Sequence, residues 1–408
     1  MQNGNGILDG IRVIDCGTYI AGPAAATIMS DFGAEVIKIE HPPEGDLFRN
    51  FPSLPGTPKA DLNYCWILTG RNRKSVALEL QKERAREILL RLVKTADVFV
   101  TNFQVPLLKR FNLTWDDLSA INERLVYAHI TGYGNEGNEA EAPAFDALAY
   151  WARSGLMTGV TGPDGRPSGP RPGIGDHPTA SALFGAIMVG LYRRERTGRG
   201  SKVGTSLMAA GAWANACDIQ AKLCGGYFPE RPPADKPVNP LIGGYMTRDL
   251  KVFMLTLLDA DREYPRLCEA IGTPELATNP MFATAAARVE YAAELYAILR
   301  SQFESRDLAE WQGLFRKYDV KWSTIPTLDE VVKDPQMRAS RAFVDLKLPN
   351  GRTIDTINSP VFVEGAQKRQ PEFAPEIGAH TREVLRGLGY DDDVIAAMLK
   401  AGVAAAAD

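Results

Sequence analysis

The sequence has little of several residue types, and each shortage argues against a class of protein. Of its 408 residues only five are cysteines and four are histidines, and the cysteines show no CxxC spacing. We therefore expect neither a disulfide-stapled fold nor a metal site built from these side chains. The odd number of scattered cysteines is typical of reduced thiols in a cytoplasmic protein.

A strong charge of one sign and a long apolar run are also missing. The chain has 46 Lys and Arg against 50 Asp and Glu, a formal net charge of −4. This balance gives no general attraction to nucleic acid or to anionic membranes, so we expect neither as a partner. The strongly apolar segment 180–192 is short for a membrane span and suits a buried helix. The stretch 1–6 has no basic region leading into an apolar one, so we expect no secretory signal and a cytoplasmic location.

What is present is an ordinary globular composition, with 45% apolar and 24% charged residues, arranged as alternating strand and helix patterns. Short apolar strands are predicted at 12–16, 35–39, 97–100, 126–131 and 202–205, and helices at 79–96, 113–121 and 179–194. Nearly continuous apolar strands separated by helices indicate a parallel sheet. The sequence therefore predicts an α/β fold with a Rossmann-like large domain.

The pattern divides the chain into three parts. Residues 1–225 are predicted to form the large Rossmann-like domain. Residues 226–330 begin with a proline-rich linker at 227–239 and continue with a strand at 251–257 and mostly helix, which indicates a smaller α+β domain. Residues 331–408 return to extended segments, with a hairpin turn at 349–351 and a helical tail, and we expect them to rejoin the large domain.

Asp176 is the most informative residue. The glycine-rich stretch 172–178 delivers its carboxylate to the start of the apolar helix, where the helix dipole and free N–H groups favour the ionised form. An accessible ionised carboxylate can act as a covalent nucleophile. An Asp in this position is more commonly only a helix cap, so the local pattern alone leaves both roles open.

A series of further motifs resembles one family over nearly the whole chain, in collinear order. The series comprises Ile7–Asp15, Ala21–Pro23, Asp31–Glu40, Arg71–Ser75, Thr101–Phe103, Ile130–Gly134, Arg196–Gly200 and Gly378–Leu385. The chain is thereby similar to the class III CoA-transferases, a family that includes formyl-CoA and carnitine CoA-transferases and the α-methylacyl-CoA racemases. The resemblance implies that Asp176 is the nucleophile. It also implies a ring-shaped subunit, with the first and last segments in one domain, in an interlocked homodimer.

The resemblance also implies the chemistry. Asp176 would attack an acyl-CoA thioester to give an aspartyl–acyl anhydride and then an aspartyl-CoA thioester, so that CoA passes to a free carboxylic acid. CoA and acyl-CoA are then substrates, and we expect no permanently bound cofactor. Each step forms a tetrahedral oxyanion that needs N–H donors. The glycine-rich approach to Asp176 and the pair Gly243–Gly244 are the candidates, although the pair is equally well a simple turn before a strand.

Several residues match the family's CoA-contacting positions. Asn102, Phe103 and Arg110 match its motif after the third predicted strand, and Arg73 and Lys74 match its basic pair before the helix predicted from residue 79. Arg and Lys are suitable partners for phosphate groups. Near the thioester, Tyr19 and Ile20 stand where relatives often carry a small or amide side chain. His41 stands where relatives have a CoA-contacting arginine, which removes one expected phosphate contact.

Other functions compete with the transferase. A racemase needs a second acid/base opposite the Asp, which that branch supplies from a Gly-His-Asp stretch. The matching stretch here places Phe145 at the histidine position, before Asp146, for which a capping role is expected. His129 and His177 are lone histidines, for which a structural or surface role is expected. The racemase therefore remains an alternative, but Phe145 favours the transferase.

Two more distant alternatives are a nicotinamide-dependent dehydrogenase and a scaffold protein without catalytic activity. The stretch 17–22 lacks the GxGxxG spacing that a dinucleotide pyrophosphate requires, and an intact Asp176 argues against the scaffold. Within the family, the stretches 173–177 and 238–240 resemble a branch that acts on 2-hydroxy and aryl-alkyl acids such as phenyllactate. Tyr19, Phe145 and Tyr150 favour an apolar or aromatic acid, while small dicarboxylates such as oxalate or succinate stay open.

Overall fold

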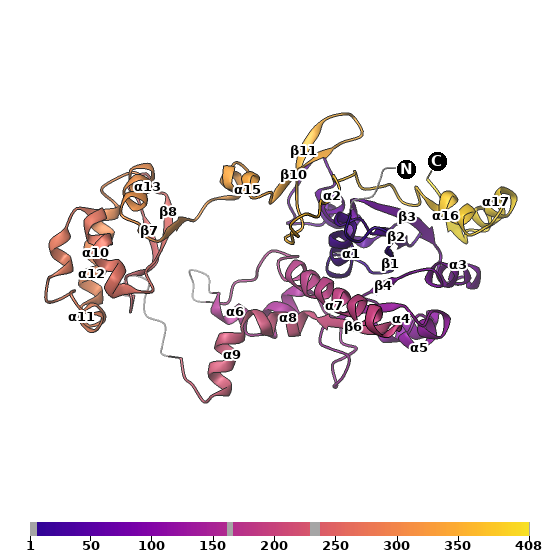
Figure 1. Cartoon of the computed structure of the whole chain (residues 1–408), viewed down its shortest axis with the longest axis horizontal. Coiled ribbons are helices and arrows are strands. Elements are labelled where there is room, and N and C mark those ends of the chain that lie inside the picture. Colours follow the sequence, from indigo (N-terminus) through magenta and orange to yellow (C-terminus); the bar gives the residue numbers. More distant parts are fainter. Residues whose placement is uncertain (1–5, 161–165, 229–236, 408) are drawn as a thin grey trace. The chain divides into compact units, whose positions relative to one another are not determined.

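The computed structural model describes residues 6–160, 166–228 and 237–407 (Figure 1). By its internal contacts the chain divides into two compact units. The first comprises Met1–Gly225 with Arg338–Asp408, and the second comprises Gly226–Met337. Each unit is described by itself below. The expected linker at 227–239 falls largely outside the described residues.

The first unit is built on a mostly parallel sheet. In the described part of the chain it has seven strands in the order β12-β3-β2-β1-β4-β5-β6. The strands are β1 (Arg12–Asp15), β2 (Glu35–Glu40), β3 (Arg73–Leu78), β4 (Val98–Thr101), β5 (Val126–Thr131), β6 (Ser201–Ser206) and β12 (Ala404–Ala405). Neighbouring strands are parallel except for β12, which runs antiparallel to β3. The predicted α/β fold with a parallel sheet is confirmed.

The strand order places a switch point between β1 and β4. From β1 the chain adds β2 and β3 on one side, and then crosses to add β4, β5 and β6 on the other. Loops that leave β1 and β4 at their carboxyl ends therefore diverge and leave a crevice between them. In open α/β sheets such a crevice is the usual place for a ligand.

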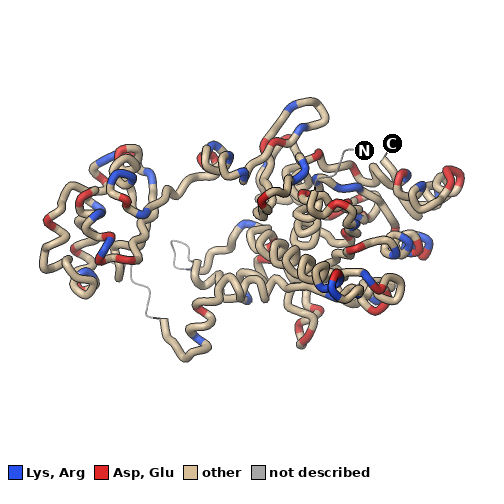
Figure 2. The backbone as a smooth tube through the Cα atoms, viewed as in Figure 1, with Lys and Arg blue, Asp and Glu red and all other residues tan. Residues whose placement is uncertain are grey.

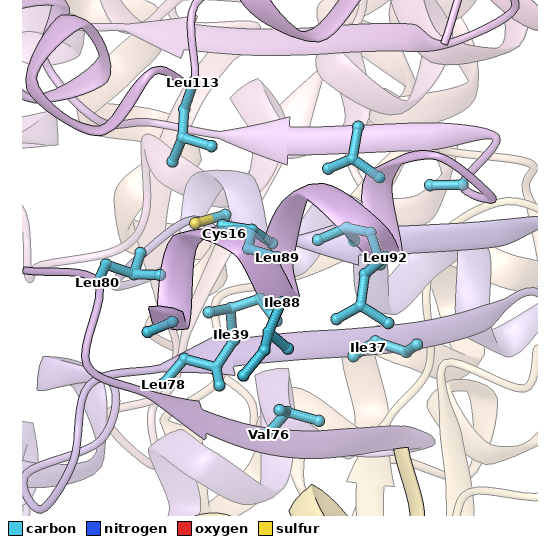
Figure 3. Packing of buried hydrophobic residues seen from close by; sticks show 14 of the residues in the cluster. Cys16, Ile37, Ile39, Val76, Leu78, Leu80, Ile88, Leu89, Leu92 and Leu113 are labelled. Atoms are coloured by element: carbon cyan, nitrogen blue, oxygen red, sulfur yellow. The ribbon is translucent and has the colours of Figure 1, made fainter. Parts of the chain in front are cut away.

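Helices cover both faces of the sheet. On one face α3 (Glu83–Val93) lies over β2 and β3, with Ile88 and Leu89 fully buried against strand side chains such as Val76 (Figure 3). Burying a side chain of this size fully contributes about 1.5–3 kcal/mol to the free energy of folding. The same cluster includes residues of α4 (Val105–Phe111), α5 (Trp115–Ile121), α16 (Thr381–Gly387) and α17 (Asp392–Lys400). The tail of the chain thus packs on the first unit.

The opposite face is covered by α1 (Ala21–Asp31) and α7 (Asp176–Thr197), which pack on Val and Ala side chains of the central strands. Small residues allow close approach here. A Cβ atom at Gly190 of α7 would lie 2.8 Å from Val126 Cγ1 and 3.0 Å from Val203 Cγ1. This close packing fixes the position of α7, and hence of Asp176 at its first residue, against the sheet.

The remaining elements of the first unit lie around the sheet. They are η1 (Leu47–Ser53), α2 (Tyr64–Gly70), the π-helical η2 (Ala147–Ala152), α6 (Leu156–Gly159), α8 (Leu207–Ala214) and α9 (Ala216–Leu223). Asn215 separates α8 from α9. The predicted turn at 349–351 joins β10 (Phe343–Lys347) and β11 (Thr353–Ile357), an antiparallel hairpin as expected.

One strand of the first unit was not predicted. Arg73 and Lys74 open the internal strand β3, and the helix expected after them from residue 79 begins at Glu83 as α3. The sequence pattern did not indicate a strand here, because the first half of β3 is polar. The Arg73 guanidinium is fully buried and ion-paired with Asp15 at 2.7 Å, so the polar start of the strand is stabilised inside the sheet.

The second unit is a small antiparallel sheet covered by helices on one face. Its strands are β7 (Ile242–Met246), β8 (Val252–Thr256) and β9 (Trp322–Thr324). Its helical segments are α10 (Ala260–Ile271), η3 (Pro274–Ala277), α11 (Ala285–Glu290), α12 (Ala292–Phe303), α13 (Leu308–Lys317) and α14 (Leu328–Val331), while α15 (Pro335–Ala339) spans the division. Aromatic rings, among them Phe253, Phe303 and Trp311, fill the core. Gly243 and Gly244 lie within β7 rather than in a turn before a strand.

The described helices include none that combines the length and the apolar character needed to cross a membrane.

Candidate active site

A cavity of about 300 Å³ lies where the sheet topology places a ligand crevice. Its walls come from the loop after β1, the loop after β4, the end of β5, the segment before η2 and the start of α7. All of these belong to the first unit. Six of the nine site residues expected from the sequence line it, namely Tyr19, Ile20, Asn102, Phe103, Phe145 and Asp176.

Asp176 is the first residue of α7, after the N-cap residue Gly175. Its carboxyl group is partly buried in the cavity wall. Burial, together with the negative charge of Asp146, raises the pKa of Asp176 to about 7. The helix N-terminus favours the ionised form, as expected, but desolvation and the second carboxylate outweigh it. Asp176 is therefore a carboxylate that takes up a proton close to neutral pH.

Asp146 organises the turn that leads to Asp176. Its Oδ2 accepts hydrogen bonds from the backbone N–H groups of Gly173 at 2.8 Å and of Gly175 at 3.2 Å. Its Oδ1 accepts from Ala147 N at 2.7 Å, so the same carboxylate caps η2. The expected capping role is present, but it is only half of what the residue does. The Gly173 and Gly175 N–H groups are engaged in this way and are not the free oxyanion donors that the sequence suggested.

The two glycines of this turn are required by their surroundings. Gly173 has a φ of +91°, a left-handed conformation that side chains other than glycine rarely adopt. Gly175 packs against Tyr150, and a Cβ atom there would lie 2.6 Å from the ring carbon Cγ. A larger residue at either position would displace the start of α7.

The loop after β1 forms the opposite wall. Tyr19 has a φ of +63°, which is unusual for an aromatic residue, and its N–H donates to Asp46 Oδ1 at 2.9 Å. Asn102 holds the same loop on both sides of Thr18: its Oδ1 accepts from Thr18 N at 2.9 Å and its Nδ2 donates to Thr18 O at 2.8 Å. The Tyr19 ring meets Phe145 edge to face, with the ring centroids 5.9 Å apart.

A buried cluster of charges lies beneath this loop. The Lys38 Nζ lies 2.7 Å from Asp46 and 3.5 Å from Asp15, and it donates to the carbonyl of Gly17 at 2.6 Å. Burial alone would lower the pKa of Lys38, but the charges of Asp15 and Asp46 outweigh burial and raise it. Lys38 therefore stays charged and fixes the loop that carries Tyr19 and Ile20.

The remaining expected CoA contacts lie elsewhere. Arg73 is buried against Asp15, and Lys74 is ion-paired with Glu35 and Glu383, so neither reaches the cavity. Arg110 is exposed in the last turn of α4, the helix that follows Asn102 and Phe103. His41 is exposed, and its two ring nitrogens contact the carboxylates of Glu44 and Glu79.

The two histidines near the site differ in their contacts. His129 lines the cavity, and its Nε2 lies 3.0 Å from the carbonyl oxygen of Phe103. The Nδ1 of His177 is buried, and the described part of the chain offers it no hydrogen-bond partner. Burial lowers the pKa of both imidazoles. Neither is expected to carry a charge at neutral pH.

The sequence did not predict the contacts by which Asp146, Asp46 and Lys38 hold the two loops of the site. Asp146 was identified only as a helix cap, because its partners Gly173 and Gly175 lie 27 and 29 residues further along the chain. Lys38 lies within β2 and Asp46 follows that strand, and the sequence pattern alone does not connect the two residues.

Comparison with known proteins identifies the family. The family model of CoA-transferase family III matches residues 8–381. The chain is 29% identical over 390 residues to (R)-2-hydroxy-4-methylpentanoate CoA-transferase of Clostridioides difficile, a match that covers 95% of this chain and 97% of that protein. It is 30% identical over 404 residues to cinnamoyl-CoA:phenyllactate CoA-transferase of Clostridium sporogenes, covering 97% and 96%.

The fold agrees with a solved structure. The crystal structure of a CaiB/BaiF family protein from Brucella suis matches with a TM-score of 0.80 at 28% identity, and the match covers 94% of this chain and 100% of that one. The model match over most of the chain and the full-length relatives confirm the resemblance found in the motifs. The chain belongs to CoA-transferase family III and is an enzyme of the CoA-transferase class.

Proposed function

We propose that the enzyme moves CoA from an acyl-CoA thioester to a free carboxylic acid through covalent intermediates on Asp176. The observation that carries this proposal is the place of Asp176: a partly buried carboxylate at the first residue of α7, in the wall of an apolar cavity at the switch point of the sheet. A carboxylate nucleophile conserves the energy of the thioester, because an acid anhydride and an aspartyl thioester are both activated acyl groups.

The proposed steps follow from this chemistry. An Asp176 oxygen attacks the thioester carbonyl and expels CoA thiolate, leaving an aspartyl–acyl anhydride. The thiolate attacks the aspartyl carbonyl and releases the donor acid as a carboxylate, leaving an aspartyl-CoA thioester. The acceptor carboxylate then attacks that thioester, giving a second anhydride and thiolate. The thiolate finally attacks the acceptor's acyl carbon, which yields the new acyl-CoA and free Asp176.

The raised pKa of Asp176 suits this role. A carboxylate that protonates near neutral pH is more basic than an exposed one, and its ionised form is less shielded by water. Burial thus strengthens the nucleophile while leaving a substantial fraction ionised at neutral pH. Because the ionised form attacks, activity should fall as the pH drops through the pKa of Asp176.

For the acid substrate we propose an apolar or aromatic 2-hydroxy acid. Tyr19 and Phe145 form an aromatic pair in the cavity wall, and the described residues that line the cavity include no Lys or Arg. A dicarboxylate would therefore bring its second carboxylate into a wall that offers it no cation. The two relatives described above are named for 2-hydroxy-4-methylpentanoate and phenyllactate, which agrees with this chemistry.

For CoA we propose that Asn102 and Phe103 contact the part of the cofactor near the thioester and that Arg110 contacts a phosphate group. Asn102 and Phe103 line the cavity, and Arg110 follows them on α4 with its side chain exposed. We do not extend a CoA role to Arg73 and Lys74, since both side chains are ion-paired away from the cavity.

We also propose a homodimer, with the interlocked rings that the family resemblance implies. Apolar side chains on the α7–α9 region are unusually exposed, at 63% for Tyr192 and 83% for Trp213. The sequence has no Lys, Arg, Asp or Glu from residue 177 to 192 or from 207 to 214, and this stretch is uniformly uncharged in Figure 2. An apolar surface of this kind is typical of a subunit interface.

The central experiment combines an Asp176→Ala variant with chemical trapping. The variant should fold and lose transfer by several orders of magnitude, since covalent catalysis has no substitute group. Wild-type enzyme incubated with acyl-CoA and hydroxylamine should carry a hydroxamate on Asp176, located by peptide mass spectrometry. Substantial turnover by the variant, or a label on a different residue, would refute the mechanism.

The same assay distinguishes the alternatives. A panel of acyl-CoA donors against 2-hydroxy acids and dicarboxylates, read by mass spectrometry, should show transfer to the apolar 2-hydroxy acids first. A racemase would instead exchange the α-hydrogen of a chiral acyl-CoA in deuterated water without any acceptor acid. We expect negligible exchange, because Phe145 cannot transfer a proton.

A further inference from the structure

Asp146 is a second buried carboxylate beside Asp176, and the reaction steps above do not use it. Only 5% of its surface is exposed. It lines the same cavity and follows Phe145 directly in the sequence. The arrangement is electrostatically unfavourable, because the negative charge of Asp146 disfavours the ionised form of Asp176. A role that requires a carboxylate at this position would account for the arrangement.

The hydrogen bonds of Asp146 show what it holds. Oδ2 receives the N–H groups of Gly173 and Gly175, so one oxygen bridges both ends of the turn just before Asp176. Oδ1 receives Ala147 N at the start of η2. The carboxylate thus ties the start of α7 to η2. Bonds from N–H groups to an ionised acceptor are stronger than those to a neutral one.

The packing around the turn leaves α7 little freedom to begin elsewhere. Gly175 lies against the ring of Tyr150, which is itself a residue of η2. Gly173 approaches Ile20 of the opposite wall, and a Cβ atom there would lie 3.0 Å from Ile20 Cδ1. Asp146 and Tyr150 therefore fix the turn from the same element, one by hydrogen bonds and the other by contact.

We propose that Asp146 is a positioning residue for Asp176: by binding the Gly173 and Gly175 N–H groups, it sets the place and direction in which α7 presents the nucleophile to the thioester. A nucleophile displaced by about 1 Å can lose on the order of 100-fold in rate. Asp146 does not itself exchange bonds or protons with the substrate. This inference rests on the proposed nucleophilic role of Asp176.

Asp146 also acts on Asp176 through its charge. Burial is the main cause of the raised pKa of Asp176, and the charge of Asp146 adds to it. Among the described residues, the other titratable groups close by are His177 on α7, His129 at β5, Tyr19 after β1 and Tyr150 on η2. Both histidines have a lowered pKa and carry little charge near pH 7. Asp146 is thus the charged neighbour that bears on the ionisation of Asp176.

Two variants separate position from charge. Asp146→Asn keeps the size of the side chain and removes the charge, and its single amide oxygen can accept from the glycine N–H groups or from Ala147 N but not from both. We expect kcat to fall roughly 10- to 100-fold with the KM for acyl-CoA changed less than about twofold, and the acid limb of the kcat/KM profile to move to lower pH. Asp146→Glu keeps the charge but displaces the turn, so kcat should fall while the acid limb stays in place.

The matched control is Asp391→Asn, which removes another helix-capping carboxylate of the same unit, at the start of α17. It should keep the wild-type kcat and pH profile. If Asp146→Asn fails to fold, Asp146→Glu carries the same test through its kcat and KM. Wild-type kcat in either folded Asp146 variant, or an equal loss in the control, overturns the inference. Failure of the proposed function is visible separately, since Asp176→Ala would then remain active in the same assay.

Discussion

At the scale of single residues, burial rather than residue type decides what each charged group can do. Arg73 and Arg110 were both expected to contact CoA. Arg73 has no exposed side-chain surface and is ion-paired with Asp15, whereas Arg110 is exposed near the end of α4. A buried cation that neutralises a buried carboxylate supports the fold, and only the exposed one is available to a phosphate.

This contrast gives a prediction with two readouts. Arg110→Ala should weaken CoA binding roughly 10- to 100-fold, the worth of a charge-assisted hydrogen bond, without changing the urea midpoint. Arg73→Met should lower the free energy of unfolding by about 3–5 kcal/mol, because Asp15 would lose its main partner. Calorimetric titration with CoA and urea unfolding measure the two effects.

Lys74→Ala is the control for binding, since Lys74 is held between Glu35 and Glu383 and its loss should leave the Kd for CoA unchanged. An unchanged Kd in Arg110→Ala would show that Arg110 is a surface charge with no role in binding.

The sequence predicted the role of some residues of the site but not of others. Asp176 could be identified because a glycine-led carboxylate and the family motifs pointed to the same position. The second function of Asp146 could not, because it depends on hydrogen bonds to backbone groups that folding brings from 27 and 29 residues away. A helix cap is a local pattern, but a bond across the site is not.

At the scale of elements, the apolar strands were predicted well and the polar one was not. β1, β2, β4, β5 and β6 all lie within one or two residues of their predicted bounds. β3 was missed because its first residues are Arg73, Lys74 and Ser75, and only Val76–Leu78 show the apolar pattern of a buried strand. The strand is stable in the sheet because its polar residues have long-range partners, which no local pattern reveals.

The start of α7 gives the prediction at this scale. Gly175→Ala would place a Cβ atom 2.6 Å from the Tyr150 ring, so the turn must shift and move Asp176. We expect kcat to fall roughly tenfold or more while the protein remains folded. Steady-state kinetics and near-UV circular dichroism measure the two properties.

Gly387→Ala is the matched change, at the end of another helix of the first unit, α16, outside the proposed subunit interface. An added Cβ atom there meets nothing within 4 Å among the described residues, so turnover should be retained. Equal kinetics in the two variants would mean that the contact with Tyr150 does not position the nucleophile.

At the scale of the whole molecule, the first unit brings together segments from both ends of the chain. Residues 338–408 pack with residues 1–225, and β12 from the tail pairs with β3. The sequence predicted such a return mainly through the family resemblance, because the tail itself shows only a short hairpin and two helices. Whether the two units act as separate domains, as expected from the sequence, stays a prediction.

The exposed apolar residues of the α7–α9 region argue for a partner at this scale. The set consists of Val189, Tyr192, Trp213 and Leu223, each more than 60% exposed. Leaving such side chains in water is unfavourable, and a second copy that presents the same surface can bury them, as in a two-fold dimer. Subunit association through this region accounts for the exposed apolar side chains on α7, α8 and α9.

The last prediction tests this association. Trp213 is 83% exposed on α8, and Trp213→Asp places a charge in the proposed interface while leaving the core of the subunit unchanged. Sedimentation equilibrium should show a dimer for the wild type and a much weaker association for the variant, because a buried unpaired carboxylate strongly opposes assembly. Ile7→Asp, which changes an apolar residue that is 58% exposed outside this region, should remain dimeric. A monomeric wild type, or a Trp213→Asp variant that associates as tightly as wild type, would place the subunit contact elsewhere or exclude it.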